Sequence, residues 1–196
     1  RYSEEFNLIR RFVTEKKVGE PVFFIAHRSS CFPCEMTKDT FAATEWRQHP
    51  RYPGGDLLDA AIHDMAALRH LFGGIKHLAA FGVPQEDEFS PYAAVTVNLE
   101  FMNGVIGTFS YFPAGREVQK PAVGLRIFGT KGQIYLEDTE CGVVNIFYAD
   151  GGHEALNFQP ERGYYNELLN FYNALMGTEE IAVTPDLEIG AFSTIY

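Results

Sequence analysis

Asp59 and His63 are the residues of this sequence whose types and spacing suit proton transfer. They lie four positions apart in a segment with helical periodicity, and residues at i and i+4 share one face of a helix. An imidazole titrates near neutrality, and a neighbouring carboxylate can orient it or hold its charge. The spacing predicts a general acid–base pair, although the same spacing also occurs in surface helix pairs without a catalytic role.

A helix over residues 57–72 is expected to carry this pair. Gly54 and Gly55 suit a tight turn ahead of the helix, and the Asp56 carboxylate is the expected N-cap of its first turn. Gly73 and Gly74 supply the stop. Apolar residues recur at helical spacing along this segment, namely Leu57, Leu58, Ala61, Ile62, Met65, Leu68, Leu71 and Phe72.

A metal site is an alternative hypothesis, with Asp59, His63 and His27 as ligands of a hydrolase or lyase. Cys31 and Cys34 have CxxC spacing, but no second ligand pair follows with the spacing of a zinc site. We therefore assign neither a zinc site nor a redox site to them. The odd, low count of three cysteines is typical of a reducing compartment, so the expected location is cytoplasmic.

Composition limits the classes of function. The chain has 196 residues, 46% of them hydrophobic, which is enough for one packed domain. A net charge of −10 argues against nucleic-acid and anionic-membrane partners, because both require a basic patch. No apolar run approaches the ~20 residues that span a bilayer. No G-x-G-x-x-G fingerprint is present, so the chain offers acid–base residues without a cofactor site of its own.

The order of expected elements predicts the fold class. Helices are expected at residues 4–17, 57–72, 161–176 and 187–196. Strands are expected at 21–28, 75–81, 92–101, 105–112, 122–128, 133–137, 143–148 and 154–158. This order predicts an α+β domain, with an open, mostly antiparallel sheet and helices packed on one face. The other face mixes polar and aromatic residues, which is typical of a surface that meets another domain or subunit.

Five segments, in order, resemble the C-terminal domain of the Gfo/Idh/MocA oxidoreductases, the family of glucose–fructose oxidoreductase and inositol dehydrogenase. The segments are Val18-Gly19-Glu20-Pro21 with a strand ending Ala26-His27-Arg28; Trp46…Pro50…Gly54-Gly55-x-x-x-Asp59-x-x-x-His63; Phe101-x-Asn103-Gly104-x-x-Gly107; Ile127-x-Gly129-Thr130-x-Gly132; and Tyr165-x-Glu167-x-x-x-Phe171-x-x-Ala174-x-x-Gly177. Together they cover nearly the whole chain.

The resemblance implies a two-domain enzyme that oxidises or reduces a CH–OH group of a sugar, a polyol or a derivative. Residues 1–196 would be its substrate-binding and oligomerisation domain, forming a homodimer or homotetramer through the open sheet face. An N-terminal Rossmann domain outside this chain would bind NAD or NADP and carry the family's catalytic lysine. His63 would be the catalytic acid–base and Asp59 its substrate-side partner, and this chain alone is expected to be inactive.

Four further residues are expected to bind substrate: His27 and Arg28 at a strand end, and Trp46 and Arg47 in the long loop before the glycines. Tyr111 is expected to border the open face. Many family members carry an aspartate three residues after the histidine, whereas this chain has Ala66 there and Asp64 nearer. This departure supports an alternative hypothesis, a ligand-binding or partner-binding homologue that kept the fold without the catalysis.

Overall fold

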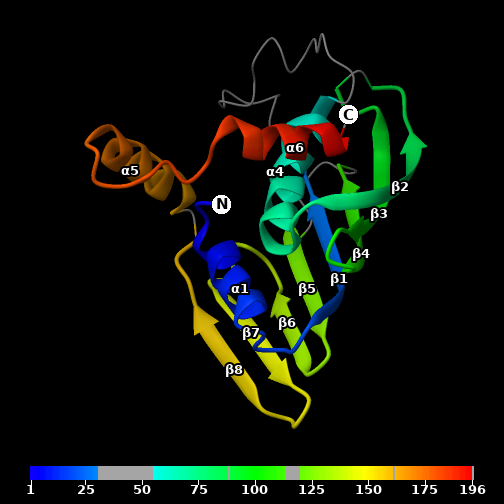
Figure 1. The fold of residues 1–196 in the computed structure, drawn as a ribbon. Coiled ribbons are helices and arrows are strands. Elements are labelled where there is room, and N and C mark those ends of the chain that lie inside the picture. Colours follow the sequence, from blue (N-terminus) through cyan, green and yellow to red (C-terminus); the bar gives the residue numbers. More distant parts are fainter. Residues whose placement is uncertain (31–54, 88, 114–119, 161, 196) are drawn as a thin grey trace.

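The computed structural model describes residues 1–30, 55–87, 89–113, 120–160 and 162–195 (Figure 1). Its helices are α1 (Glu4–Thr14), α4 (Gly55–Phe72), α5 (Gly163–Leu175) and α6 (Pro185–Ile195). Its strands are β1 (Pro21–Ser29), β2 (Ile75–Pro84), β3 (Tyr92–Phe101), β4 (Ile106–Phe112), β5 (Val123–Gly129), β6 (Gly132–Leu136), β7 (Val143–Tyr148) and β8 (His153–Asn157). Within these ranges, none of the helices combines the length and apolar character needed to cross a bilayer.

The strands form one eight-stranded sheet in the order β2-β3-β4-β1-β5-β6-β7-β8. β1 lies parallel to β4, and each of the other neighbouring pairs is antiparallel. The predicted open, mostly antiparallel sheet is therefore confirmed. The insertion of β1 between β4 and β5 brings the end of the first strand beside the end of β4, although they are more than eighty residues apart in sequence.

One face of the sheet packs against α1 and α4 (Figure 1). Alternate residues of β1, β3, β4, β5, β6 and β7 point into this core, because successive side chains of a strand point to opposite faces. β2 and β8, at the two edges of the sheet, contribute no buried residue. Phe24 of β1, Phe72 of α4 and Phe101 of β3 pack with ring centroids 5.2 to 5.8 Å apart. The helix-covered face of the sheet is therefore closed by aromatic packing, as the predicted fold class requires.

The opposite face of the sheet, called here the open face, carries both polar and apolar side chains. Thr96 of β3 and Ser110 of β4 lie opposite one another on it, with their hydroxyl oxygens 3.4 Å apart. Ile25 of β1 and Ile106 of β4 are exposed large apolar side chains on the same face. This face thus has the mixed character that the alternation of residues in the strands predicts.

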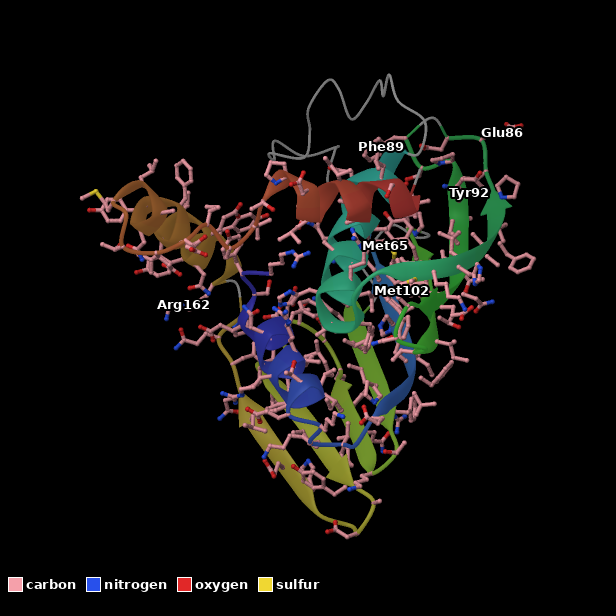
Figure 2. All side chains as sticks on the ribbon, viewed as in Figure 1. Met65, Glu86, Phe89, Tyr92, Met102 and Arg162 are labelled. Atoms are coloured by element: carbon pink, nitrogen blue, oxygen red, sulfur yellow. The ribbon has the colours of Figure 1, made fainter. Side chains whose placement is uncertain are left out.

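α5 stands away from the sheet and lies next to the N-terminus (Figure 1). Asn170 is its one buried residue, whereas Leu168 is 69% exposed and Phe171 is 55% exposed. Figure 2 shows its side chains projecting outward from the ribbon on several sides. The apolar stripe that predicts this helix is therefore uncovered within the described chain.

α4 begins at Gly55, two residues earlier than expected. Gly55 has a φ of +42°, a backbone conformation that glycine adopts readily. The next amide, that of Asp56, donates to the Phe89 carbonyl at 2.7 Å. Phe89 lies near the start of α4 in Figure 2, and a Cβ added at Gly55 would lie 1.8 Å from its carbonyl oxygen. The first turn of α4 is therefore pressed directly against the segment that connects β2 to β3.

Candidate active site

Asp59 and His63 lie one turn apart on α4, at the positions that the helical spacing predicts. His63 is exposed, and Asp59 is half-buried. They form a polar stripe beside the buried face of the helix, where Ala60 and Ala61 pack into the core. The pair is thus accessible from outside the domain, which an acid–base pair acting on a bound substrate requires. Their catalytic roles stay predictions.

Arg28 is half-buried and is held by Asp64, the neighbour of His63 on α4. Its Nε donates to Asp64 Oδ2 at 2.5 Å, and its Nη2 donates to Asp64 Oδ1 at 3.1 Å. Asp64 is 6% exposed. Burial raises the pKa of Asp64, and the Arg28 guanidinium opposes that shift, with smaller opposing contributions from His63 and His27. The pair ties the end of β1 to the helix that carries His63.

This ion pair changes how the predicted role of Arg28 must be understood. Arg28 was expected to contact substrate, yet two of its nitrogens are committed to Asp64. The sequence contained one sign of this arrangement, because helical spacing places Asp64 on the same face of α4 as the buried residues Ala60 and Ala61. A substrate contact through the remaining nitrogen, Nη1, stays a prediction.

His27 lies on the opposite face of the sheet from Arg28, because neighbouring residues of a strand point to opposite sides. Its Nε2 lies 3.2 Å from the Pro121 carbonyl oxygen, to which it donates. Its ring stacks on Phe112 with the centroids 6.4 Å apart. His27 therefore belongs to the open face, and β1 separates it from the α4 side where Asp59 and His63 lie. Trp46 and Arg47 fall outside the described residues, as do Cys31 and Cys34.

Asp56 forms a buried polar network at the start of α4. It is 1% exposed, and its Oδ2 accepts from Ser90 Oγ at 2.7 Å and from Tyr111 Oη at 3.1 Å. Because the Tyr111 hydroxyl donates to Asp56, the Ser30 hydroxyl, 2.8 Å away, donates to Tyr111. The network joins α4 to β4, to the residue after β1 and to the segment before β3.

The network changes two sequence-based expectations. Asp56 lies within the first turn instead of ahead of it, and its partners include the distant Ser90 and Tyr111 as well as the Leu57 amide. Burial raises the pKa of Asp56 to about 6, while hydrogen bonds from Ser90, Tyr111 and Leu57 oppose the shift. The expectation that Tyr111 borders the open face is wrong. It is 1% exposed on the helix-covered face, because the β4 alternation aligns it with buried Phe109.

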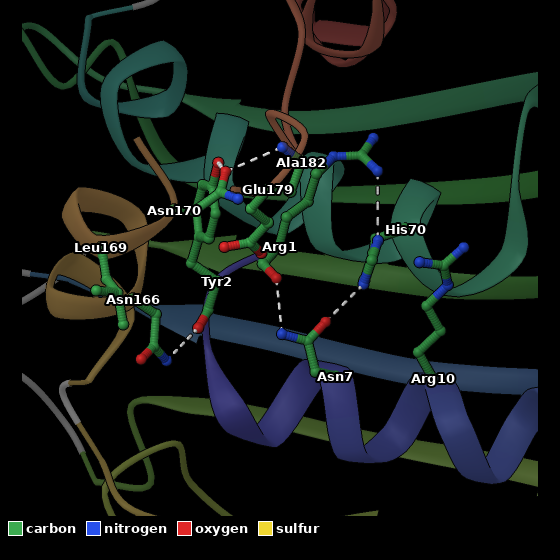
Figure 3. Close-up of a pocket in the computed structure, with 10 residues that line it drawn as sticks. All are labelled: Arg1, Tyr2, Asn7, Arg10, His70, Asn166, Leu169, Asn170, Glu179 and Ala182. Atoms are coloured by element: carbon green, nitrogen blue, oxygen red, sulfur yellow. Dashed lines mark hydrogen bonds between the residues drawn. The ribbon is translucent and has the colours of Figure 1, made fainter. Parts of the chain in front are cut away.

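A cavity of about 430 Å³ lies elsewhere, between the N-terminal residues, α1, the last turns of α4 and α5 (Figure 3). His70 Nδ1 accepts from Arg1 at 3.3 Å, so its Nε2 carries the proton and donates to Asn7 at 3.0 Å. Burial, with smaller contributions from the charges of Arg10 and Arg1, lowers the pKa of His70 to about 4. His70 is neutral and structural, and none of the predicted site residues is among the described residues that line this cavity.

The described residues give the metal hypothesis no support. Within the described ranges, no group of three or more His, Cys, Asp or Glu side chains is arranged to hold a metal ion. Asp59 and His63 lie on the α4 side of the sheet, whereas His27 lies on the open face and bonds to Pro121. The geometry therefore separates the three proposed ligands.

Comparison with known proteins decides the family. The model of the GFO/IDH/MocA C-terminal domain matches residues 6–135, which include β1, α4 and the first strands of the sheet. The chain belongs to this family. The resemblance that the motifs around Asp59 and His63 indicated is therefore confirmed. The yeast protein YMR315W from Saccharomyces cerevisiae is 28% identical over 171 residues, which are 82% of this chain.

Solved structures of GFO/IDH/MocA-type oxidoreductases share the fold. An oxidoreductase from Thermotoga maritima superposes with a TM-score of 0.80 at 21% identity, over 99% of this chain and 56% of that one. Levoglucosan dehydrogenase in complex with NADH and levoglucosan gives a TM-score of 0.75 at 16% identity, over 99% of this chain and 61% of that one. The chain also spans 48% of the length of YMR315W, so it is about half as long as these relatives.

Proposed function

We propose that this chain is the substrate-binding and acid–base domain of an NAD(P)-dependent oxidoreductase acting on a CH–OH group of a sugar, a polyol or a derivative. The observation that carries the proposal is the pair Asp59 and His63, accessible on α4 within the region that matches the GFO/IDH/MocA C-terminal domain. The complex of levoglucosan dehydrogenase with NADH and a sugar derivative supports the substrate class.

Oxidation of a CH–OH group removes a proton and a hydride, and the residues of this chain account for the proton. The His63 imidazole accepts the hydroxyl proton, and in the reverse direction it returns that proton to the carbonyl oxygen. Asp59, one turn earlier, orients the imidazole and stabilises its charge after the transfer. Asp64, behind His63, is neutralised by Arg28, so it adds no net charge to the site.

The dinucleotide is assigned to a second domain, because this chain does not provide a cradle for it. The sequence has no G-x-G-x-x-G turn, and the glycine turn ahead of α4 is followed by the buried carboxylate of Asp56, which would repel a pyrophosphate. We therefore infer that an N-terminal Rossmann domain would hold NAD or NADP, whose nicotinamide would accept the hydride. The half-length match to YMR315W supports this division.

The surface of α5 supports the same division of the protein. Tyr2 Oη donates to Asn170 Oδ1 at 3.0 Å, and Asn166 Nδ2 donates to the Tyr2 carbonyl at 3.0 Å. A polypeptide that enters the domain at Arg1 therefore arrives beside α5. The exposed apolar side chains of α5, such as Leu168 and Phe171, give such a polypeptide a surface to pack on.

We also propose that the protein is a cytoplasmic homodimer or homotetramer that associates through the open face. Ile25 is 46% exposed and Ile106 is 50% exposed on neighbouring strands, within a surface that also carries hydroxyl side chains. A mixed surface of this kind is typical of interfaces between subunits. The low cysteine count supports the cytoplasmic location.

The experiment that tests the function measures NAD and NADP reduction by the full-length protein across a panel of sugars and polyols. His63→Ala is expected to lower kcat by roughly 10²-fold or more, the usual effect of losing a general base. His77→Ala is the matched control, since His77 is an exposed histidine of β2 paired with Glu100. Turnover that survives in His63→Ala would assign the base to another residue.

A ligand-binding homologue without catalysis is the second candidate, and the position of Ala66 favours it. That protein would bind a sugar or polyol without reducing NAD or NADP on any substrate of the panel. Calorimetric titration of the full-length protein with the same panel separates the two candidates. Any NAD(P) reduction that depends on His63 excludes the second one.

A further inference from the structure

Two buried aspartates of α4 flank the acid–base pair in sequence. Asp56 precedes Asp59 by three residues, and Asp64 follows His63 directly. Each aspartate is held by a side chain from the sheet. The four residues of these two contacts are called here the α4 clamp: Asp56 with Tyr111, and Asp64 with Arg28.

The two sheet residues of the α4 clamp are direct neighbours. Arg28 and Tyr111 are register partners on the parallel strands β1 and β4, and both point to the helix-covered face. Their side chains reach in different directions along α4, because the two aspartates are eight positions apart, about 12 Å along a helix. One site on the sheet thus holds the helix at two points.

Two points of attachment define the orientation of α4. Asp56, Ala60 and Asp64 form a buried stripe at i, i+4 and i+8, and the accessible stripe of Asp59 and His63 runs beside it. A rotation of the helix by one residue, roughly 100°, would turn Asp59 and His63 onto its buried face. Apolar packing tolerates such adjustments better than hydrogen bonds of fixed geometry do.

The choice of polar groups is itself informative. Replacing a buried ion pair by apolar residues of similar volume is often neutral or stabilising, so Arg28–Asp64 is a poor means of adding stability. A buried carboxylate such as Asp56 is costly as well. Both groups contribute a defined geometry instead, and they do so immediately before and after the acid–base pair.

We propose that the α4 clamp is a set of positioning residues, which holds α4 in the rotation and tilt that direct Asp59 and His63 at the substrate. This inference rests on the proposed function for its catalytic consequence. Its structural consequence is that the order of the first half of α4 depends on Tyr111 and Arg28. This dependence can be measured without any substrate.

The first test is amide hydrogen exchange on the full-length protein. Tyr111→Phe removes the hydroxyl that donates to Asp56 and keeps the aromatic ring in the core. The amide exchange rates of residues 55–64 are expected to rise about fivefold or more, because the substitution removes one buried hydrogen bond. The matched control is Tyr148→Phe. Tyr148 is on β7, far from α4, and its hydroxyl donates to Glu154 at 2.7 Å. Equal exchange in Tyr111→Phe and wild type over this range would overturn the proposal.

The second test separates positioning from stability. Asp56→Ala and Tyr111→Phe are expected to lower kcat about 10- to 100-fold with KM changed about twofold or less, since the substrate contacts stay and the geometry shifts. Asp56→Asn keeps an oxygen that accepts from Ser90 and Tyr111, so it is expected to recover kcat to within about threefold of wild type. Folding is checked by circular dichroism for each variant.

Asp138→Asn is the stability control, because the Asp138 carboxylate is buried and accepts from the Ala122 amide at 2.6 Å, away from α4. It is expected to lower the melting temperature and keep kcat. Raised exchange over residues 55–64 in Tyr111→Phe without any loss of kcat would overturn the positioning role. Absence of turnover in the wild-type protein would instead refute the proposed function, while the exchange result would still decide whether the clamp orders α4.

Discussion

A single buried carboxyl, that of Asp56, is expected to make stability depend on pH. Burial raises its pKa from 3.8 to about 6 in the folded protein. The folded state therefore binds the proton more tightly than the unfolded state, and stability is lost as pH rises from about 4 to about 6. A shift of this size corresponds to about 3 kcal/mol.

Asp56→Asn removes this ionisation while keeping an oxygen for Ser90 and Tyr111. The stability advantage of the variant over wild type is expected to be small at pH 4 and to grow until about pH 6, above which it is constant. Urea unfolding between pH 4 and 8 measures the difference. A constant difference between the two proteins across this range would show that Asp56 does not titrate there. Together with retained kcat, the predicted result would separate the charge of Asp56 from its geometry.

Residue types and spacing were sufficient to predict that Asp59 and His63 share one face of α4, but not that Asp56 and Asp64 are buried or what holds the helix. Asp59 and His63 belong to one local pattern, so helical periodicity alone places them on one face. The partners of Asp56 are Ser90, 34 positions away, and Tyr111, 55 positions away. Contacts of that range depend on the strand order, which no local pattern in the sequence contains.

At the scale of elements, the parallel pairing of β1 with β4 is the feature that sequence reasoning missed. Alternation predicted both strands, and Asn103-Gly104 predicted the turn between β3 and β4, which the structure contains. The insertion of β1 between β4 and β5 could not be predicted, because alternation identifies a strand without showing which distant strands it pairs with. The side to which Tyr111 points follows instead from alternation within β4, which places it with buried Phe109, so its expected place on the open face was wrong for a local reason.

α5 is the element whose sequence pattern and environment disagree most within the described chain. Its apolar residues have the spacing of a buried helix, yet Leu168 is 69% exposed. Leu168→Glu is expected to destabilise the full-length protein by about 2 kcal/mol, because it would place a charge in the proposed contact with the Rossmann domain. Thermal unfolding of the full-length protein measures this effect.

Met102→Glu is the matched control for the α5 substitution. Met102 is 70% exposed at the turn between β3 and β4 (Figure 2), at the other side of the domain. Its substitution is expected to change stability by about 0.5 kcal/mol or less, as for ordinary surface positions. Equal effects of the two substitutions would mean that α5 is uncovered in the full-length protein too, and the docking of a second domain on it would have to be abandoned.

For the whole molecule, the arrangement of layers explains why one domain can supply two different surfaces. The helix-covered face buries the α4 clamp and leaves Asp59 and His63 accessible beside it. The open face has no part in that arrangement, since His27 and Ile25 point away from α4. The proposed catalysis on one side and the proposed association on the other are therefore expected to respond separately to substitutions on alternate residues of the same strand, β1.

Ile25→Arg tests the association directly. Ile25 is flanked on the neighbouring strands by Thr108 of β4 and Arg126 of β5, so the substitution places a second positive charge beside Arg126 in the open face. Like charges that are brought together in an interface cost several kcal/mol, which is enough to dissociate a dimer of ordinary affinity. Light scattering of the full-length protein is expected to show a dimer or tetramer for wild type and for Met102→Arg, and a monomer for Ile25→Arg. An Ile25→Arg protein of unchanged mass would place the interface on another surface, and a monomeric wild-type protein would mean that the open face is not used for self-association.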